Sequence, residues 1–275
     1  MKKVVLIGAG GKMGCRITNN LIHSDYQMYY LESGDAGKKR LADMGVEVSN
    51  QEVVIPEGDI IILAVPDVSI EKVSAHIVPL MKSGALLVTL DPAAALAGKI
   101  YHRSDIGIYI SHPAHPSVFN WEPTEEAQRD YFGGSLAKQV TVSALMQGAD
   151  EDYKIGDELT RKMYAPVIRN YKITVEQMGL LEPALVETLC STLQVIVREA
   201  LDIVIEKGVP AEAAREFLLG HLNIQLAVIY NQIPGAVFSD AANKAIVRGK
   251  PLLIKENWRD VFDPDNVLEQ IRDIT

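Results

Sequence analysis

Two histidines, each followed by a proline, are the clearest candidates for chemistry in this chain. His112 and His115 lie three positions apart in the run Ser111-His-Pro-Ala-His-Pro116. Proline fixes its own backbone and restrains the residue before it toward extended geometry, so we expect a stiff loop that holds both imidazoles. Histidine can take a proton from an alcohol or bind a metal ion that polarises its oxygen. We therefore predict that at least one of the two is catalytic, although a lone histidine is more often structural.

A carboxylate that could act opposite His112 is found at Glu182, which is followed by Pro183. Glu182 would serve in acid–base chemistry or as a metal ligand. One histidine and one carboxylate are few ligands, so water and substrate oxygens would have to complete such a metal site. The alternative is an acidic helix N-terminus favoured by the helix dipole, with Pro183 at the first helical position. The residues alone leave both interpretations open.

A glycine-rich turn at the start of the chain predicts a dinucleotide site. A short β-branched apolar run ends at Ile7, and apolar positions at helical spacing follow Gly14. Gly8 permits a tight turn, and the missing side chains of Gly10 and Gly11 let a pyrophosphate approach the helix N-terminus. Either Gly10 or Gly11 can be the middle glycine of the motif. The predicted cofactor contacts from this turn are Gly8, Gly10, Gly11, Lys12, Met13 and Gly14.

An acidic residue at Glu32 follows the second predicted strand, where this class of fold binds the ribose 2′-hydroxyl. A carboxylate there would repel a 2′-phosphate, so NAD is favoured over NADP. The nearby cations Lys38, Lys39 and Arg40 would argue for NADP, but we interpret them as a solvated helix face.

Polar residues also follow later strands, at the edge where parallel sheets bind ligands. We predict cofactor contacts from Pro66, Asp67 and Asp91. The alternative for Asp67 and Asp91 is helix capping or turn formation.

The elements that would position these residues alternate between strand and helix in the first half of the chain. We predict an α/β fold, a doubly wound parallel sheet of the Rossmann type, over residues 1–173. The predicted strands cover residues 4–7, 27–31, 46–48, 59–65, 85–90 and 106–110, with 139–145 and 167–174 as possible extensions. Residues 120–131 form either a lid or a surface excursion.

The second half, residues 174–275, is predicted to be an all-helical domain. One long helix covers residues 174–207, and Pro183 either kinks it or marks its true start. Further helices are expected over residues 211–230, 239–247 and 265–274. The long helix is too apolar to stand alone, so we predict a homodimer through this domain.

The composition limits the protein's class and partners. The 275 residues have a mean hydropathy of +0.07 and a formal net charge of −9, which argues against nucleic acid or anionic membrane as partners. No stretch approaches the roughly 18 uninterrupted apolar residues of a spanning helix, and no cleavage site follows Met1. The two cysteines, Cys15 and Cys190, have no metal-binding spacing. We therefore expect a cytoplasmic protein.

Four motifs together resemble a group of bacterial NAD-binding proteins, the D-apionate oxidoisomerase group. They are Gly8-Ala-Gly-Gly-Lys-Met-Gly14-Cys-Arg-Ile17, Ser111-His-Pro-Ala-His-Pro116, Gly179-Leu-Leu-Glu-Pro183 and Gly220-His-Leu-Asn223. The resemblance implies a Rossmann domain, a helical dimerisation domain similar to the C-terminal domain of phosphogluconate dehydrogenase, and oxidation of a branched sugar acid. It also implies a divalent metal such as zinc on His112 and Glu182, with His115 as the competing ligand.

Three functions follow as hypotheses. The first joins oxidation by NAD to a metal-assisted ketol rearrangement, in which His115 moves protons. The second is a plain NAD-dependent hydroxyacid dehydrogenase with His112 as the base. Glu182 lies where β-hydroxyacid dehydrogenases carry a lysine, which argues against it. The third is a non-catalytic NAD-sensing protein, which the rigid double His-Pro segment argues against.

Overall fold

The computed structural model describes the whole chain, Met1–Thr275, and divides into two compact units. Unit 1 comprises Met1–Glu182 together with Leu268–Thr275, and unit 2 comprises Pro183–Val267. Most of the last helix, α12 (Pro264–Ile274), therefore belongs to unit 1. The boundary expected between residues 173 and 174 stays a prediction.

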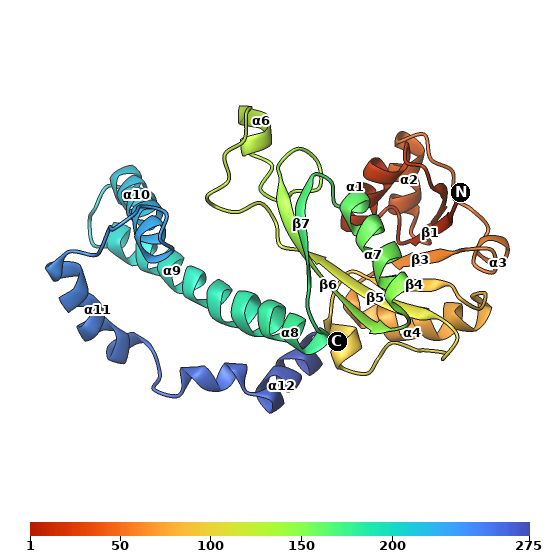
Figure 1. Ribbon diagram of the computed structural model, residues 1–275. Coiled ribbons are helices and arrows are strands. Elements are labelled where there is room, and N and C mark those ends of the chain that lie inside the picture. The colour runs from red at the N-terminus through yellow and green to blue at the C-terminus, as the bar shows by residue number, and fades with distance from the viewer. The chain divides into compact units, whose positions relative to one another are not determined.

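Unit 1 is built on one seven-stranded sheet in the order β2-β1-β3-β4-β5-β6-β7 (Figure 1). The strands are β1 (Lys3–Ile7), β2 (Gln27–Leu31), β3 (Ile60–Leu63), β4 (Leu86–Thr89), β5 (Gly107–Pro113), β6 (Gln139–Gln147) and β7 (Val167–Lys172). The first five strands are parallel, while β6 pairs with β5 in antiparallel fashion and β7 is parallel to β6. The Rossmann prediction is confirmed, and the two added strands run against the first five.

Helices cover both faces of this sheet, and each face has its own hydrophobic core. The helices of unit 1 are α1 (Lys12–Leu21), α2 (Asp35–Asp43), α3 (Gln51–Val54), α4 (Asp67–Ile77), α5 (Ala93–Leu96), α6 (Glu125–Gln128), α7 (Asp150–Met163) and α8 (Val175–Gly179). One core includes Ile17 of α1 and Leu159 of α7. The other includes Ile70 of α4 and Met178 of α8. Strands β3 and β4 are buried at every position because both faces are covered.

Two predicted local structures are wrong. Residues 46–48 form no strand, because Gly45 ends α2 with a φ of +72° and the segment runs on as irregular chain. The segment with His112 is not a loop, because β5 continues through His112 to Pro113 and His112 pairs with Val142 of β6. Proline is tolerated there because the pairing with β4 stops at Ile110, so the edge on that side is open.

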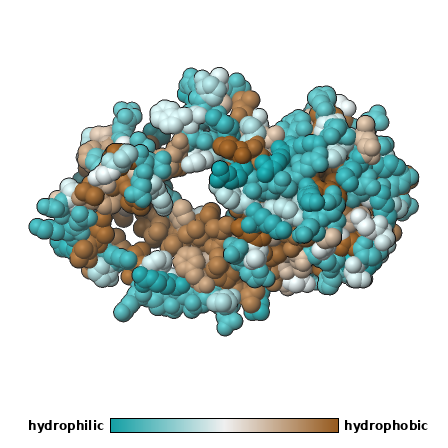
Figure 2. Space-filling view, in the orientation of Figure 1, coloured by the Kyte–Doolittle hydropathy of each residue, from teal (hydrophilic) through white to brown (hydrophobic).

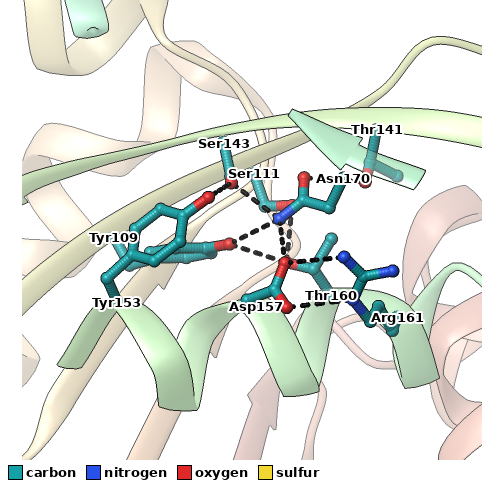
Figure 3. A network of polar contacts seen from close by, with 9 residues as sticks. All are labelled: Tyr109, Ser111, Thr141, Ser143, Tyr153, Asp157, Thr160, Arg161 and Asn170. Atoms are coloured by element: carbon teal, nitrogen blue, oxygen red, sulfur yellow. Dashed lines mark hydrogen bonds and ion pairs between the residues drawn. The ribbon is translucent and has the colours of Figure 1, made fainter. Parts of the chain in front are cut away.

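A polar network, most of it buried, links β5 by hydrogen bonds to α7, β6 and β7 (Figure 3). Its members are Tyr109, Ser111, Thr141, Ser143, Tyr153, Asp157, Thr160, Arg161 and Asn170. Thr160 of α7 donates to Ser111 Oγ at 2.8 Å, and Asn170 of β7 donates to Asp157 Oδ1 at 2.7 Å. Neighbouring residues of a strand point to opposite faces, so the network that holds Ser111 on the α7 face directs His112 to the other face.

Unit 2 is all-helical and continues the helical run that begins in unit 1. A π-helical segment, Leu180–Ser191, is followed by α9 (Thr192–Glu206), α10 (Ala211–Ile229) and α11 (Asp240–Leu253). Pro183 lies inside the π-helical segment and does not mark the start of the helix, which begins at Val175. The predicted helix at residues 239–247 is longer than expected and passes through Pro251.

The helices of unit 2 leave a large apolar surface uncovered within the single chain. Neither α9 nor α11 has a buried residue, and α10 has only Ala214. Phe217 is 70% exposed and Val247 is 76% exposed. Figure 2 shows hydrophobic residues over much of the helical surface. By length and composition the run Val175–Glu206 could cross a membrane, a property that core helices of soluble proteins share, and only 11% of its most apolar window is buried.

Candidate functional site

The glycine turn between β1 and α1 is formed by close backbone contacts that no side chain could enter. Gly8 has a φ of +79°, which favours glycine. A Cβ on Gly14 would overlap the Gly8 carbonyl oxygen, so α1 packs directly on the turn. Gly11 is the N-cap of α1 and no side chain caps it. The helix N-terminus therefore presents backbone N–H groups that can donate hydrogen bonds to an anion.

The choice of middle glycine follows from the surroundings of Gly10 and Gly11. A Cβ on Gly10 would overlap the backbone of Gly37 in α2, so packing alone explains that glycine. A Cβ on Gly11 would stand 3.2 Å from the Gly8 carbonyl oxygen, a much milder conflict. Packing within the fold therefore explains Gly10 but does not require a glycine at position 11. Because Gly11 is also the N-cap of α1, where a pyrophosphate would approach, this geometry favours Gly8, Gly11 and Gly14 as the three glycines of the motif.

Glu32, at the end of β2, is held against the glycine turn. Its Oε2 accepts the backbone N–H of Gly10 at 3.0 Å, which places the carboxylate where a ribose hydroxyl would be read. Arg40 is exposed, as expected, but its Nε also donates to the Gly10 carbonyl oxygen at 2.7 Å. Lys38 and Lys39 do lie on the exposed surface, each paired with an aspartate of α2.

Three side chains with metal-binding atoms meet at the ends of β4 and β5. His112 Nε2 lies 3.3 Å from Glu182 Oε2, and His112 Nδ1 lies 3.7 Å from Asp91 Oδ2. One ligand atom from each of the three residues lies within 4.8 Å of the others, and all three are partly buried. The helical run begins at Val175, seven residues before Glu182, so Glu182 and Pro183 do not form the acidic helix N-terminus of the alternative interpretation.

The hydrogen bonds of His112 indicate what this cluster can hold. Nδ1 lies 2.8 Å from the Leu90 carbonyl oxygen, which only accepts, so Nδ1 carries a hydrogen. In the neutral ring, Nε2 then directs a lone pair at the Glu182 carboxylate. That contact is favourable only with a proton or a metal cation between the two atoms. A histidine whose other N–H is held by a backbone carbonyl is the usual arrangement of a metal ligand.

Two aspartates matter at this site: Asp91, a member of the cluster, and Asp67, which lies close to it. Asp91 Oδ1 accepts the backbone N–H of Ala93 at 2.7 Å, so Asp91 both fixes the start of α5 and faces His112. Asp67 is the first residue of α4, but Pro66 is the N-cap and no side chain caps the helix. Burial, reinforced by the charges of Asp91 and Glu182, raises the pKa of Asp67 to about 6.

The raised pKa of Asp67 predicts a pH-dependent gain in stability for Asp67→Asn. Between the usual pKa of 3.8 and about 6, the unfolded chain ionises while the folded carboxyl keeps its proton, so the wild type loses stability as pH rises. We expect the variant to be more stable by about 1–2 kcal/mol above pH 6, after allowance for solvent screening, and equal near pH 3.5. Urea unfolding of chelator-treated protein without NAD measures this. Exposed Asp35→Asn is the control, and an equal difference at both pH values would contradict the assignment.

His115 lies beyond the end of β5 and outside the cluster of Asp91, His112 and Glu182. Its φ is +60°, an uncommon conformation for a residue with a side chain. Its Nδ1 lies 2.8 Å from the Phe132 carbonyl oxygen and therefore donates, which leaves Nε2 as a proton acceptor in the neutral ring. The structure thus gives His115 a defined tautomer but no carboxylate partner.

The remaining predicted residues and the insert also have definite places. Lys12 is the first residue of α1 and is exposed, while Met13 is partly buried against the core. The insert at residues 120–131 contains α6 and is closed by Asp130, whose carboxylate accepts three backbone N–H groups. The contacts of Arg40 with Gly10 and of Phe132 with His115 could not be predicted, because nothing in the local pattern reveals contacts this distant along the chain.

Comparison with known proteins identifies relatives over the full length of the chain. Residues 120–275 match the family "Phosphogluconate dehydrogenase (decarboxylating) C-term", and residues 3–92 match "NADP oxidoreductase coenzyme F420-dependent". The chain is 50% identical to a D-apionate oxidoisomerase of Cupriavidus necator, covering 100% of this chain and 99% of the relative. It is 45% identical to a D-apionate oxidoisomerase of Rhizobium rhizogenes over 100% of both chains.

A solved structure is similar over the same length. It is a semialdehyde dehydrogenase NAD-binding protein from Cupriavidus necator in complex with calcium and NAD. It matches with a TM-score of 0.98 at 50% identity and 100% coverage of both chains.

Proposed function

Because this chain belongs to the D-apionate oxidoisomerase family, we propose that it oxidises D-apionate with NAD and rearranges the carbon skeleton to 3-oxo-isoapionate. The observation that carries the proposal is the cluster of Asp91, His112 and Glu182 at the strand ends of a dinucleotide-binding sheet. A dehydrogenation needs a hydride acceptor and a base, and a ketol rearrangement would be assisted by a Lewis acid that polarises the substrate oxygens.

The cofactor of the proposed reaction is NAD, which supplies the hydride acceptor. A relative of known structure contains NAD, and Glu32 beside the turn disfavours a 2′-phosphate. The residues that we assign to the cofactor are Gly8, Gly10, Gly11, Lys12, Met13, Gly14, Glu32, Pro66, Asp67 and Asp91. Among them, Gly10 and Met13 would contribute indirectly. Gly10 allows α2 to pack closely against the glycine turn, and Met13 packs against the hydrophobic core.

A divalent metal such as zinc fits His112 and Glu182, with Asp91 as a third ligand. Bound there, it would act as a Lewis acid on the substrate oxygens. The fit rests on the Nε2 lone pair of His112, which faces the Glu182 carboxylate while Nδ1 is held by Leu90. The solved relative contains calcium, but an imidazole nitrogen suits zinc or a similar metal better than calcium, which prefers oxygen ligands.

The side chains themselves would orient the substrate and move its proton. We assign the proton of the 2-hydroxyl to Nε2 of His115, which the bond to Phe132 leaves as an acceptor. The hydride leaves to NAD, so the first product is a 2-keto acid beside a tertiary alcohol. The hydroxymethyl group then leaves the carbon of the tertiary alcohol with its bonding pair and bonds to the keto carbon. The tertiary alcohol thereby becomes a ketone, the 2-keto group becomes an alcohol, and the proton moves from the first oxygen to the second, so no further oxidant is needed.

Product analysis distinguishes the proposal from its alternatives. We expect D-apionate and NAD to give NADH, with NMR showing that the branch has moved to the neighbouring carbon. Linear aldonates are the control and should give little NADH. A product with the original skeleton would mean a plain hydroxyacid dehydrogenase with His112 as base, and NAD binding without NADH would mean a non-catalytic NAD-sensing protein.

We also propose a homodimer through the helices of unit 2, in the cytoplasm and without nucleic acid or membrane partners. The exposed apolar residues of α9, α10 and α11 support the dimer, because surfaces of this extent are rarely left in water. The net charge of −9 supports the absence of nucleic acid and anionic membrane partners.

A further inference from the structure

The ring of Phe132 gathers polar groups from two other segments of unit 1. Lys12 Nζ lies 4.6 Å from the ring centroid, and the guanidinium carbon of Arg16 lies 3.8 Å from it. The His115 ring meets Phe132 edge to face at a centroid distance of 4.8 Å. The insert that follows β5 is thereby joined to the first turns of α1, next to the glycine turn.

Neither of the two cations on this ring forms a salt bridge, and Asp130 is the one carboxylate whose charge Arg16 is seen to stabilise. Arg16 contacts the Phe132 ring and donates to the Lys12 carbonyl oxygen at 3.1 Å, and neither of these groups is an anion. The carboxylate of Asp130 lies nearby but is already occupied by the N–H groups of its own loop, at 2.8 to 3.1 Å. In a chain of net charge −9, two cations that share a single neighbouring carboxylate beside a helix N-terminus indicate a site for an anion.

The surroundings hold this pair in place before any ligand binds. A guanidinium stacked on an aromatic ring keeps its in-plane N–H donors free, which is the geometry that binds carboxylate or phosphate oxygens. The ring itself is fixed, because the Phe132 carbonyl accepts from His115 and Asp130 closes the loop around Gly133. His115, which donates to the Phe132 carbonyl, has a positive φ that is uncommon for a residue with a side chain.

We propose that Lys12 and Arg16, held on the Phe132 ring, bind an anionic oxygen group of a reactant. The two sources of that group are the pyrophosphate of NAD and the carboxylate of the sugar acid. The pyrophosphate source needs only the dinucleotide fold, whereas the carboxylate source rests on the proposed function. Arg16 lies one turn beyond Lys12 on α1, so either ligand would lie against the N-terminal turns of this helix.

Two variants and one control test the site in the full-length protein. Arg16→Met removes the guanidinium and keeps an unbranched apolar side chain on the ring, while Phe132→Leu keeps both cations and removes the stacking surface. The control is Lys154→Met, which removes one exposed charge from α7. NAD affinity is measured by calorimetry without substrate, and KM for D-apionate is measured at saturating NAD.

We expect Arg16→Met to weaken one of the two ligands about tenfold and Phe132→Leu to weaken the same ligand about threefold. Loss of NAD affinity would identify the pyrophosphate, and a raised KM with unchanged NAD affinity would identify the carboxylate. Thermal unfolding checks that each variant is folded. If Arg16→Met is folded and both constants stay within twofold of the wild type, the proposal is overturned. Because NAD affinity is measured without turnover, the pyrophosphate source is tested even if the proposed function fails, whereas the carboxylate source would fall with that function.

Discussion

Glu182→Gln is expected to lower turnover by about 10²- to 10³-fold while the affinity for NAD stays unchanged. The substitution keeps the size of the side chain and one carbonyl oxygen, but it removes the negative charge that faces His112 Nε2 at 3.3 Å. Without that charge, the pair can no longer hold a divalent cation between nitrogen and oxygen. The loss should therefore appear in metal content and in turnover together.

The measurement pairs elemental analysis of the purified protein with NADH formation from D-apionate. The same substitution at Glu199, an exposed residue of α9, is the control and should change neither quantity. A chelator should abolish turnover of the wild type, and zinc should restore it to the wild type but not to Glu182→Gln. Full turnover of a rigorously metal-free sample would overturn the metal assignment and leave His112 as a simple base.

The fold of unit 1 could be predicted because its signals are local. Short apolar runs ending in glycine, proline or aspartate marked β1, β3 and β4, and these strands are buried on both faces as the pattern required. The direction of β6 could not be predicted, because antiparallel pairing with β5 depends on how the chain between them turns. The end of β5 was not predicted for the same reason, since pairing with β6 extends the strand beyond Ile110 as far as Pro113.

The candidate site could be predicted only in part. Residue types and strand ends identified His112, Glu182 and Asp91, but only the fold brings the three together. His115 looked equivalent to His112 in sequence, and the structure separates them because one lies on the strand and the other beyond it. Arg40 is exposed, as predicted for a charged surface, yet it also donates to the glycine turn 30 residues away. Contacts of this kind depend on tertiary packing and cannot be predicted from the spacing of residues along the sequence.

Gly14→Ala is expected to remove NAD binding and to lower the free energy of unfolding by about 2–4 kcal/mol. Alanine normally favours a helix over glycine, so propensity alone would predict a gain. Here the new Cβ would overlap the Gly8 carbonyl oxygen and lie 2.6 Å from the Ala9 carbonyl. These are backbone atoms of the turn that cannot rotate away, so α1 must move off the end of β1.

That movement would displace the helix N-terminus to which the pyrophosphate is proposed to bind. Gly249→Ala in α11 is the matched control, because it is the same change within a helix and nothing lies within 4 Å of the added Cβ. Calorimetry with NAD and urea unfolding of both variants give the two readouts. A Gly14→Ala protein that binds NAD as the wild type does would show that α1 need not rest on the turn. It would also remove the reason to treat Gly8, Gly11 and Gly14 as the three glycines of the motif.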